Sequence, residues 1–149
     1  MESVYNQVKN FKRKYPTTIT HHRLKKHAKI VEKFLNPGET VNYAFVAQKN
    51  AKTFDFFETA IIAVTNERVL IGQKRVLFGY FINSITPDLY NDMQLRAGLL
   101  WGNITIDTAK EVIELSNISK SALPEIETQI STFMMEAKKE YKNTEGSSD

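Results

Sequence analysis

The spacing of apolar residues predicts helices in the first part of the chain. Residues 4–15 carry apolar side chains three or four positions apart, the period of one helix face, at Val4, Val8, Phe11 and Tyr15. Pro16 ends this pattern. A second pattern of the same kind runs from Thr20, a favourable N-cap, to about residue 35. Asn36-Pro37-Gly38 then ends it, so both predicted helices are short and amphipathic.

From Val41 onward the apolar residues alternate with polar ones, which indicates β-strands. Asn66-Glu67 is predicted to be a tight turn, because Asn tolerates the left-handed conformation that such turns need. The polar stretch from Gln48 to Asp55 is expected to be a loop. The predicted strands cover residues 41–48, 57–65, 68–73, 75–82, 93–96, 99–107 and 111–115. Such a succession of short strands favours a sandwich or a barrel.

A long amphipathic helix is expected over residues 123–141. Its apolar stripe consists of Ile126, Ile130, Phe133, Met134, Ala137 and Tyr141. Pro124 falls in the first turn, where a helix needs no backbone N–H. We therefore divide the chain into a helical extension (1–36), a domain of strands and a closing helix (37–142) and a polar tail (143–149) that is expected to be disordered.

Four short segments resemble, in the same order, segments of bacterial pleckstrin-homology (PH) domains. They are Leu35-Asn36-Pro37-Gly38-Glu39, Thr65-Asn66-Glu67-Arg68-Val69-Leu70-Ile71, Phe81-Ile82-Asn83-Ser84-Ile85 and Gly102-Asn103-Ile104-Thr105-Ile106. The similarity covers roughly residues 34–137. It implies an α+β fold, a pleckstrin-homology-like seven-stranded antiparallel β-barrel capped by a C-terminal α-helix, here preceded by one or two basic amphipathic helices. It also implies a non-enzymatic binding or assembly module with a protein partner or a homo-oligomer, since some related domains form rings.

The same resemblance draws attention to the loop of the first hairpin. Eukaryotic relatives that hold phosphoinositides use basic residues in and beside this loop, and here the loop offers Lys49 and Lys52. The arginine usual on the second strand is missing. Asp55 and Glu58 would repel a phosphate. A specific inositol-phosphate site is therefore not expected.

Positive charge is concentrated near the N-terminus. The chain has a net charge of +3, yet residues 1–36 carry nine Lys or Arg and two Glu. Such asymmetry indicates an acidic partner, which is either the remainder of the same protein or an external anionic surface. The candidate residues are Lys12, Arg13, Lys14, Arg23, Lys25, Lys26 and Lys29.

These basic helices allow three interpretations. In the first, their apolar stripes pack on the barrel and the lysines are solvated. In the second, Val4, Val8, Phe11 and Tyr15 enter a membrane surface while the lysines meet anionic lipid heads. In the third, which we consider the alternative function, nucleic acid is bound by Arg23, Lys25, Lys26, Lys29 and Lys33.

Little in the sequence favours catalysis or a cofactor. The chain has no cysteine, which excludes thiolate chemistry and fits a reducing compartment. His21, His22 and His27 lack the i, i+4 spacing of helical metal pairs, and we interpret them as a solvated helix start. Asp88 and Asp92 could be a catalytic carboxylate pair, but acid–base catalysis needs burial or a charged neighbour to separate the two pKa values. We interpret them as part of a polar surface loop, where the sequence shows neither. We expect no metal, no cofactor and no enzyme. With no secretory signal visible, the expected location is cytoplasmic, with peripheral contact at a membrane as an option.

Trp101 and Arg68 are further candidates for interaction. If Leu100, Ile104 and Ile106 face inward, Trp101 faces outward and needs cover from the N-terminal helices or from a partner. Trp101 is therefore a candidate interface residue. Arg68 could bind an anion, but we expect it to pair with Glu67, Glu58 or backbone carbonyls.

Overall fold

The computed structural model describes residues 3–50, 57–74 and 79–146. These residues form α1 (Val4–Lys14), α2 (His21–Lys33), β1 (Val41–Asn50), β2 (Phe57–Thr65), β3 (Val69–Lys74), β4 (Tyr80–Ile85), β5 (Tyr90–Ala97), β6 (Trp101–Thr108), β7 (Val112–Ser119), a 3₁₀ turn (Lys120–Ala122) and α3 (Leu123–Gly146). Both predicted N-terminal helices are confirmed. Ser3 and Thr20 cap them, because each hydroxyl accepts a hydrogen bond from the backbone N–H three residues on.

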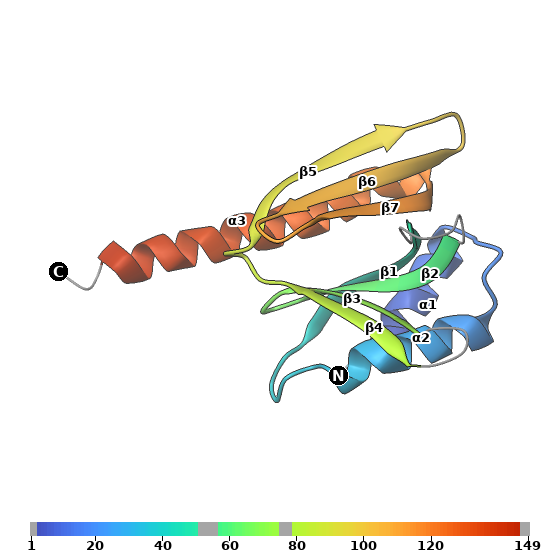
Figure 1. Cartoon of the computed structure of the whole chain (residues 1–149), viewed down its shortest axis with the longest axis horizontal. Helices are drawn as coiled ribbons and strands as arrows, with labels where there is room; N and C mark the ends of the chain where they lie inside the picture. The colour runs from blue at the N-terminus through green and yellow to red at the C-terminus, as the bar shows by residue number, and fades with distance from the viewer. Residues whose placement is uncertain (1–2, 51–56, 75–78, 147–149) are drawn as a thin grey trace.

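The strands of the described residues form one antiparallel sheet in the order β4-β3-β2-β1-β7-β6-β5. β1 pairs with β7 only at Gln48–Ser116 and Lys49–Leu115, so the sheet curls there into two halves. Figure 1 shows β1–β4 forming one half and β5–β7 the other, with α3 running along the second half. The PH-like fold is confirmed. The sheet is a half-barrel rather than a closed one, with β4 and β5 as its two edges.

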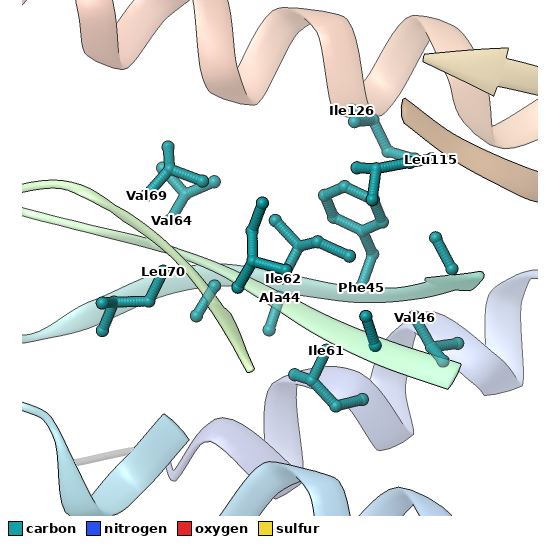
Figure 2. Packing of buried hydrophobic residues seen from close by; sticks show 14 of the residues in the cluster. Ala44, Phe45, Val46, Ile61, Ile62, Val64, Val69, Leu70, Leu115 and Ile126 are labelled. Carbon is teal, nitrogen blue, oxygen red and sulfur yellow. The ribbon is translucent and has the colours of Figure 1, made fainter. Parts of the chain in front are cut away.

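The core explains why the central strands are apolar on both faces. Residues 60–64 of β2 are buried almost completely. Figure 2 shows Phe45 of β1 pointing toward Leu115 and Ile126, on the side where α3 lies, while Ile61 points toward the N-terminal helices. Because α1 and α2 cover one face and β5–β7 with α3 cover the other, β2 reads as a continuous apolar segment rather than an alternating one.

Helix α1 is part of this core. Val4 and Val8 have no exposed surface, and the ring of Phe11 lies 5.9 Å from that of Phe45 and 6.3 Å from that of Tyr43, between centroids. The interpretation in which the apolar stripe of α1 enters a membrane is therefore wrong for this structure, because those side chains are buried against β1.

Several predicted bounds are corrected. Strand β1 continues to Asn50, so Lys49 lies in a strand. Strand β4 covers Tyr80–Ile85, and residues 75–78 of the predicted strand 75–82 lie outside the described residues. Helix α3 continues to Gly146. Residues 143–146, expected to be disordered, are thus helical, since no Pro or Gly interrupts the helix before Gly146. Residues 147–149 lie outside the described residues.

Candidate functional site

The seven predicted cations lie in the last turn of α1 and the first three turns of α2. The connection between α1 and α2 is short and the two helices pack against each other, so the last turn of α1 and the first turns of α2 come together (Figure 1). We call this set the basic end. It consists of Lys12, Arg13, Lys14, Arg23, Lys25, Lys26 and Lys29.

Within the described residues, one carboxylate compensates one charge of the basic end. Lys14 forms an ion pair with Glu125 in the first turn of α3, and Glu125 also accepts a hydrogen bond of 2.8 Å from the hydroxyl of Tyr43. Burial would raise the pKa of Glu125, but the hydrogen bonds from Lys14 and Tyr43 outweigh it and lower that pKa. This contact joins α1, β1 and α3.

The other cations of the basic end have neutral partners or none. Lys12 donates to the carbonyl of Ile19, and Arg23 donates to the hydroxyl of Thr59 at 3.3 Å. Among the described residues we find no hydrogen-bond or ion-pair partner for the exposed side chains of Arg13, Lys25, Lys26 and Lys29. The acidic side chains of the described residues therefore leave most of this charge facing solvent.

His27 does not belong to a solvated helix start. Its side chain is buried, and its Nδ1 accepts a hydrogen bond of 2.9 Å from the backbone N–H of Lys74. Burial, and then the charges of Arg23, Lys26 and Lys74, lower the pKa of His27 to about 4. His27 is therefore neutral at neutral pH and fastens α2 to the end of β3. Among the described residues, no three His, Asp or Glu side chains are grouped so that they could hold a metal ion.

A second polar cluster, away from the basic end, is built on Glu39 and Arg68. The Glu39 side chain has no exposed surface and that of Arg68 is 16% exposed. Arg68 donates to both carboxylate oxygens of Glu39, from Nε and from a terminal nitrogen, each at 3.0 Å. The hydroxyl of Thr65 and the backbone N–H of Asn36 also donate to Glu39, at 2.6 and 2.9 Å. Both carboxylate oxygens therefore have partners.

This cluster joins the segment after α2 to the β2–β3 turn. Arg68 also donates to the carbonyl of Phe34 at 2.7 Å and to the hydroxyl of Ser84 at 3.2 Å. Burial would raise the pKa of Glu39, but hydrogen bonds from Arg68, Thr65 and Asn36 lower it below its usual value. We expected Arg68 to pair with Glu67, Glu58 or carbonyls. It does contact a carbonyl, but its carboxylate partner is Glu39, so it is not free to bind a ligand anion.

Comparison with known proteins agrees with this geometry. Residues 35–132 match the bacterial PH domain family. The chain belongs to this family. The match begins in the segment that contains Glu39 and spans the turn that contains Arg68, so the two halves of the polar cluster lie within it.

This bacterial PH domain is similar to part of a solved structure. A crystal structure of the C-terminal domain of an unknown protein from Leishmania infantum shares 18% identity, covering 62% of this chain and 84% of its own, with a TM-score of 0.44. No curated protein matches. Within the described ranges, no helix has both the length and the apolar character needed to cross a membrane.

The described part of this PH domain contains only one of the two lysines of the candidate ligand site in the first hairpin loop. Lys49 lies in β1, and its Nζ is 3.5 Å from the centre of the Phe81 ring of β4. The ring face attracts this ammonium. Lys52 and Asp55 lie outside the described residues, and so does the side chain of Glu58. The prediction that Asp55 and Glu58 repel a phosphate at this loop therefore stays a prediction.

Trp101 faces outward, as the alternation of β6 predicts, because Ile104 and Ile106 are buried on the opposite face. The intramolecular cover that we considered is incomplete, since 49% of Trp101 is exposed. Leu100, expected to face inward, is 68% exposed, and Leu99 is 90% exposed. The sequence reasoning missed this group because a run of apolar residues normally indicates burial. The turn expected at Ala97-Gly98, directly before this run, is the signal that indicates exposure.

Proposed function

We propose that this bacterial PH domain is a non-enzymatic binding module that attaches to anionic membrane surfaces through the basic end. The observation that carries the proposal is the position of the cations. Two helices that are packed into the domain core hold Arg13, Lys25 and Lys26 in fixed places, exposed and without a partner among the described residues. Fixed cations on one side of a protein attract an anionic surface without requiring any segment to unfold.

The attachment is electrostatic and reversible. Each basic residue near an anionic leaflet contributes about 1 kcal/mol. Several cations of the basic end would thus hold the protein at the surface with an affinity that falls as salt screens the charges. PH-like domains commonly mediate protein or lipid interactions, and the uncompensated positive charge favours anionic lipid here.

The triple variant Arg13→Ala, Lys25→Ala and Lys26→Ala is expected to bind phosphatidylserine-containing vesicles on the order of 100-fold more weakly than the parent chain. The reason is the loss of about 3 kcal/mol from three charges. All three side chains are exposed, so the fold is expected to persist. Co-sedimentation over a range of vesicle concentrations gives the two dissociation constants.

A matched control separates position from total charge. Lys110 lies in the turn between β6 and β7, Lys139 and Lys142 lie in the second half of α3, and all three are exposed. Both segments lie away from the α1–α2 connection (Figure 1). Changing these three to alanine removes the same net charge, yet this variant should bind the vesicles nearly as well as the parent chain. Equal weakening in both triple variants would contradict the proposal. A parent chain that fails to sediment with anionic vesicles would also contradict it. If that chain instead bound DNA or RNA through Lys25, Lys26 and Lys29, the nucleic-acid alternative would replace the membrane proposal.

A further inference from the structure

The turn between β5 and β6 presents a compact apolar group to solvent. Leu99 is 90% exposed, Leu100 68% and Trp101 49%. We call these three residues the apolar tip. Large apolar side chains that gather on the surface of a soluble protein mark an interaction site.

The apolar tip is held outward by the fold around it. The Gly98 N–H donates to the carbonyl of Trp101 at 2.8 Å and closes the turn, and the Lys120 N–H donates to the carbonyl of Leu100 at 3.1 Å. Strand β6 passes directly over the start of α3 at Gly102, where an added Cβ would come within 2.4 Å of the Leu123 side chain. These contacts fix the base of the hairpin against the domain, so the tip cannot fold back without breaking them.

Within the described residues, the charged side chains nearest to the apolar tip along the chain are positive. Residues 93–106 contain Arg96 and no Asp or Glu. Lys120 is exposed beside the tip, since its backbone is hydrogen-bonded to Leu100. The nearest carboxylate along the chain after Lys120 is Glu125, which is already paired with Lys14 of the basic end. An apolar projection flanked by two cations is complementary to an anionic bilayer, which offers a negative surface and an apolar interior.

The apolar tip and the basic end also lie at the same end of the molecule. Figure 1, with the long axis horizontal, shows the β5–β6 turn and the α1–α2 connection at the end opposite the C-terminus. The 3₁₀ turn and the start of α3 link the two, through Lys120 at the tip and Glu125 at Lys14. A flat surface that approaches this end can therefore meet both.

We propose that the apolar tip inserts into the anionic bilayer to which the basic end attaches, with Leu99, Leu100 and Trp101 entering the boundary between head groups and acyl chains. This inference rests on the proposed function. Trp is well suited to that boundary, because its ring is apolar while its N–H bonds to the polar layer. A second copy of the chain is a poorer occupant. Only Leu99 of the three is close to fully exposed, and a stable dimer buries roughly 800 Å² on each partner.

Trp101 is the single tryptophan of the chain, so its fluorescence reports on the tip alone. On addition of phosphatidylserine-containing vesicles, its emission should shift to shorter wavelength, and lipids brominated near the head group should quench it. The variant Leu99→Ser with Leu100→Ser keeps Trp101 and should lose most of the shift while binding the vesicles about tenfold more weakly. The control variant Val112→Ser with Met135→Ser removes two other exposed apolar side chains and should behave like the parent chain.

Each outcome has one meaning. If the protein sediments with the vesicles but Trp101 emission does not change, the insertion is wrong and the electrostatic attachment stands. If the protein does not sediment, both proposals are wrong. If the emission shifts as protein concentration rises in the absence of lipid, the apolar tip contacts a second copy and the insertion proposal is overturned.

Discussion

Replacing Glu39 by glutamine is expected to lower the free energy of unfolding by about 3 kcal/mol. The carboxylate is fully buried and accepts hydrogen bonds from Arg68, Thr65 and the N–H of Asn36. Glutamine has nearly the same shape, but it leaves the Arg68 charge without its anion. Removing one partner of a buried ion pair costs about 3–5 kcal/mol, and the partial exposure of Arg68 places this case at the lower end. Urea denaturation monitored by circular dichroism measures the change.

The same substitution at Glu67 is a matched control, because this carboxylate is exposed and bonds to the side chain of Asn36. Glu67→Gln should change stability by less than about 1 kcal/mol. The pKa of Glu39 is lowered in the folded protein, so its contribution is present at neutral pH and is lost as pH falls through that lowered pKa. The difference between the parent chain and Glu39→Gln should therefore shrink in acid. Equal stability of the Glu39 and Glu67 variants at neutral pH would contradict a structural role for the cluster.

Replacing Phe11 by alanine is expected to cost about 3–4 kcal/mol. Phe11 is 5% exposed and its ring packs against Phe45, Tyr43 and Tyr15. Truncation of a buried aromatic side chain costs about 3–5 kcal/mol through lost apolar burial and the cavity that remains. The measurement is again the free energy of unfolding of the full chain.

Leu99→Ala is the matched control, since Leu99 is 90% exposed and its truncation should leave stability within about 0.5 kcal/mol of the parent chain. A Phe11→Ala variant as stable as the parent chain would mean that α1 is not part of the core. For the same reason, deletion of residues 1–19 is a poor test of membrane binding, because it removes the buried Val4, Val8 and Phe11 along with the charges.

The spacing of apolar residues predicted the elements that have one apolar and one polar face, and those that consist of an uninterrupted apolar run. Helices α1 and α2, strand β2 and the β6–β7 hairpin lie close to where the sequence places them. Strand β5 extends over Tyr90–Ala97 although only its second half was predicted, because most of it is exposed on both faces and shows no alternation. Strand β1 reaches Asn50 through pairing with β2, which continues past the apolar residues.

The charges of the basic end could be predicted, but their partners could not. Two basic helices joined by a short connection bring their cations together whatever they pack on. The contacts that decide the role of each charge are distant in sequence: Lys14 meets Glu125, Arg68 meets Glu39 and His27 meets the backbone of Lys74. Each depends on how elements that are distant in the sequence pack together. The exposure of Leu99 and Leu100 likewise depends on where the hairpin ends in space, which local composition does not encode.

The central claim is that α1 stays packed in the domain while the basic end is bound to a membrane. Hydrogen–deuterium exchange of the full chain, free and bound to phosphatidylserine-containing vesicles, tests it most directly. Buried, hydrogen-bonded segments of the core exchange slowly. The account requires the backbone amides of α1 to exchange about as slowly as those of β1, both in solution and on the vesicles. Fast exchange of α1 on vesicles, with β1 still protected, would contradict the account, because it would mean that α1 leaves the core to bind lipid.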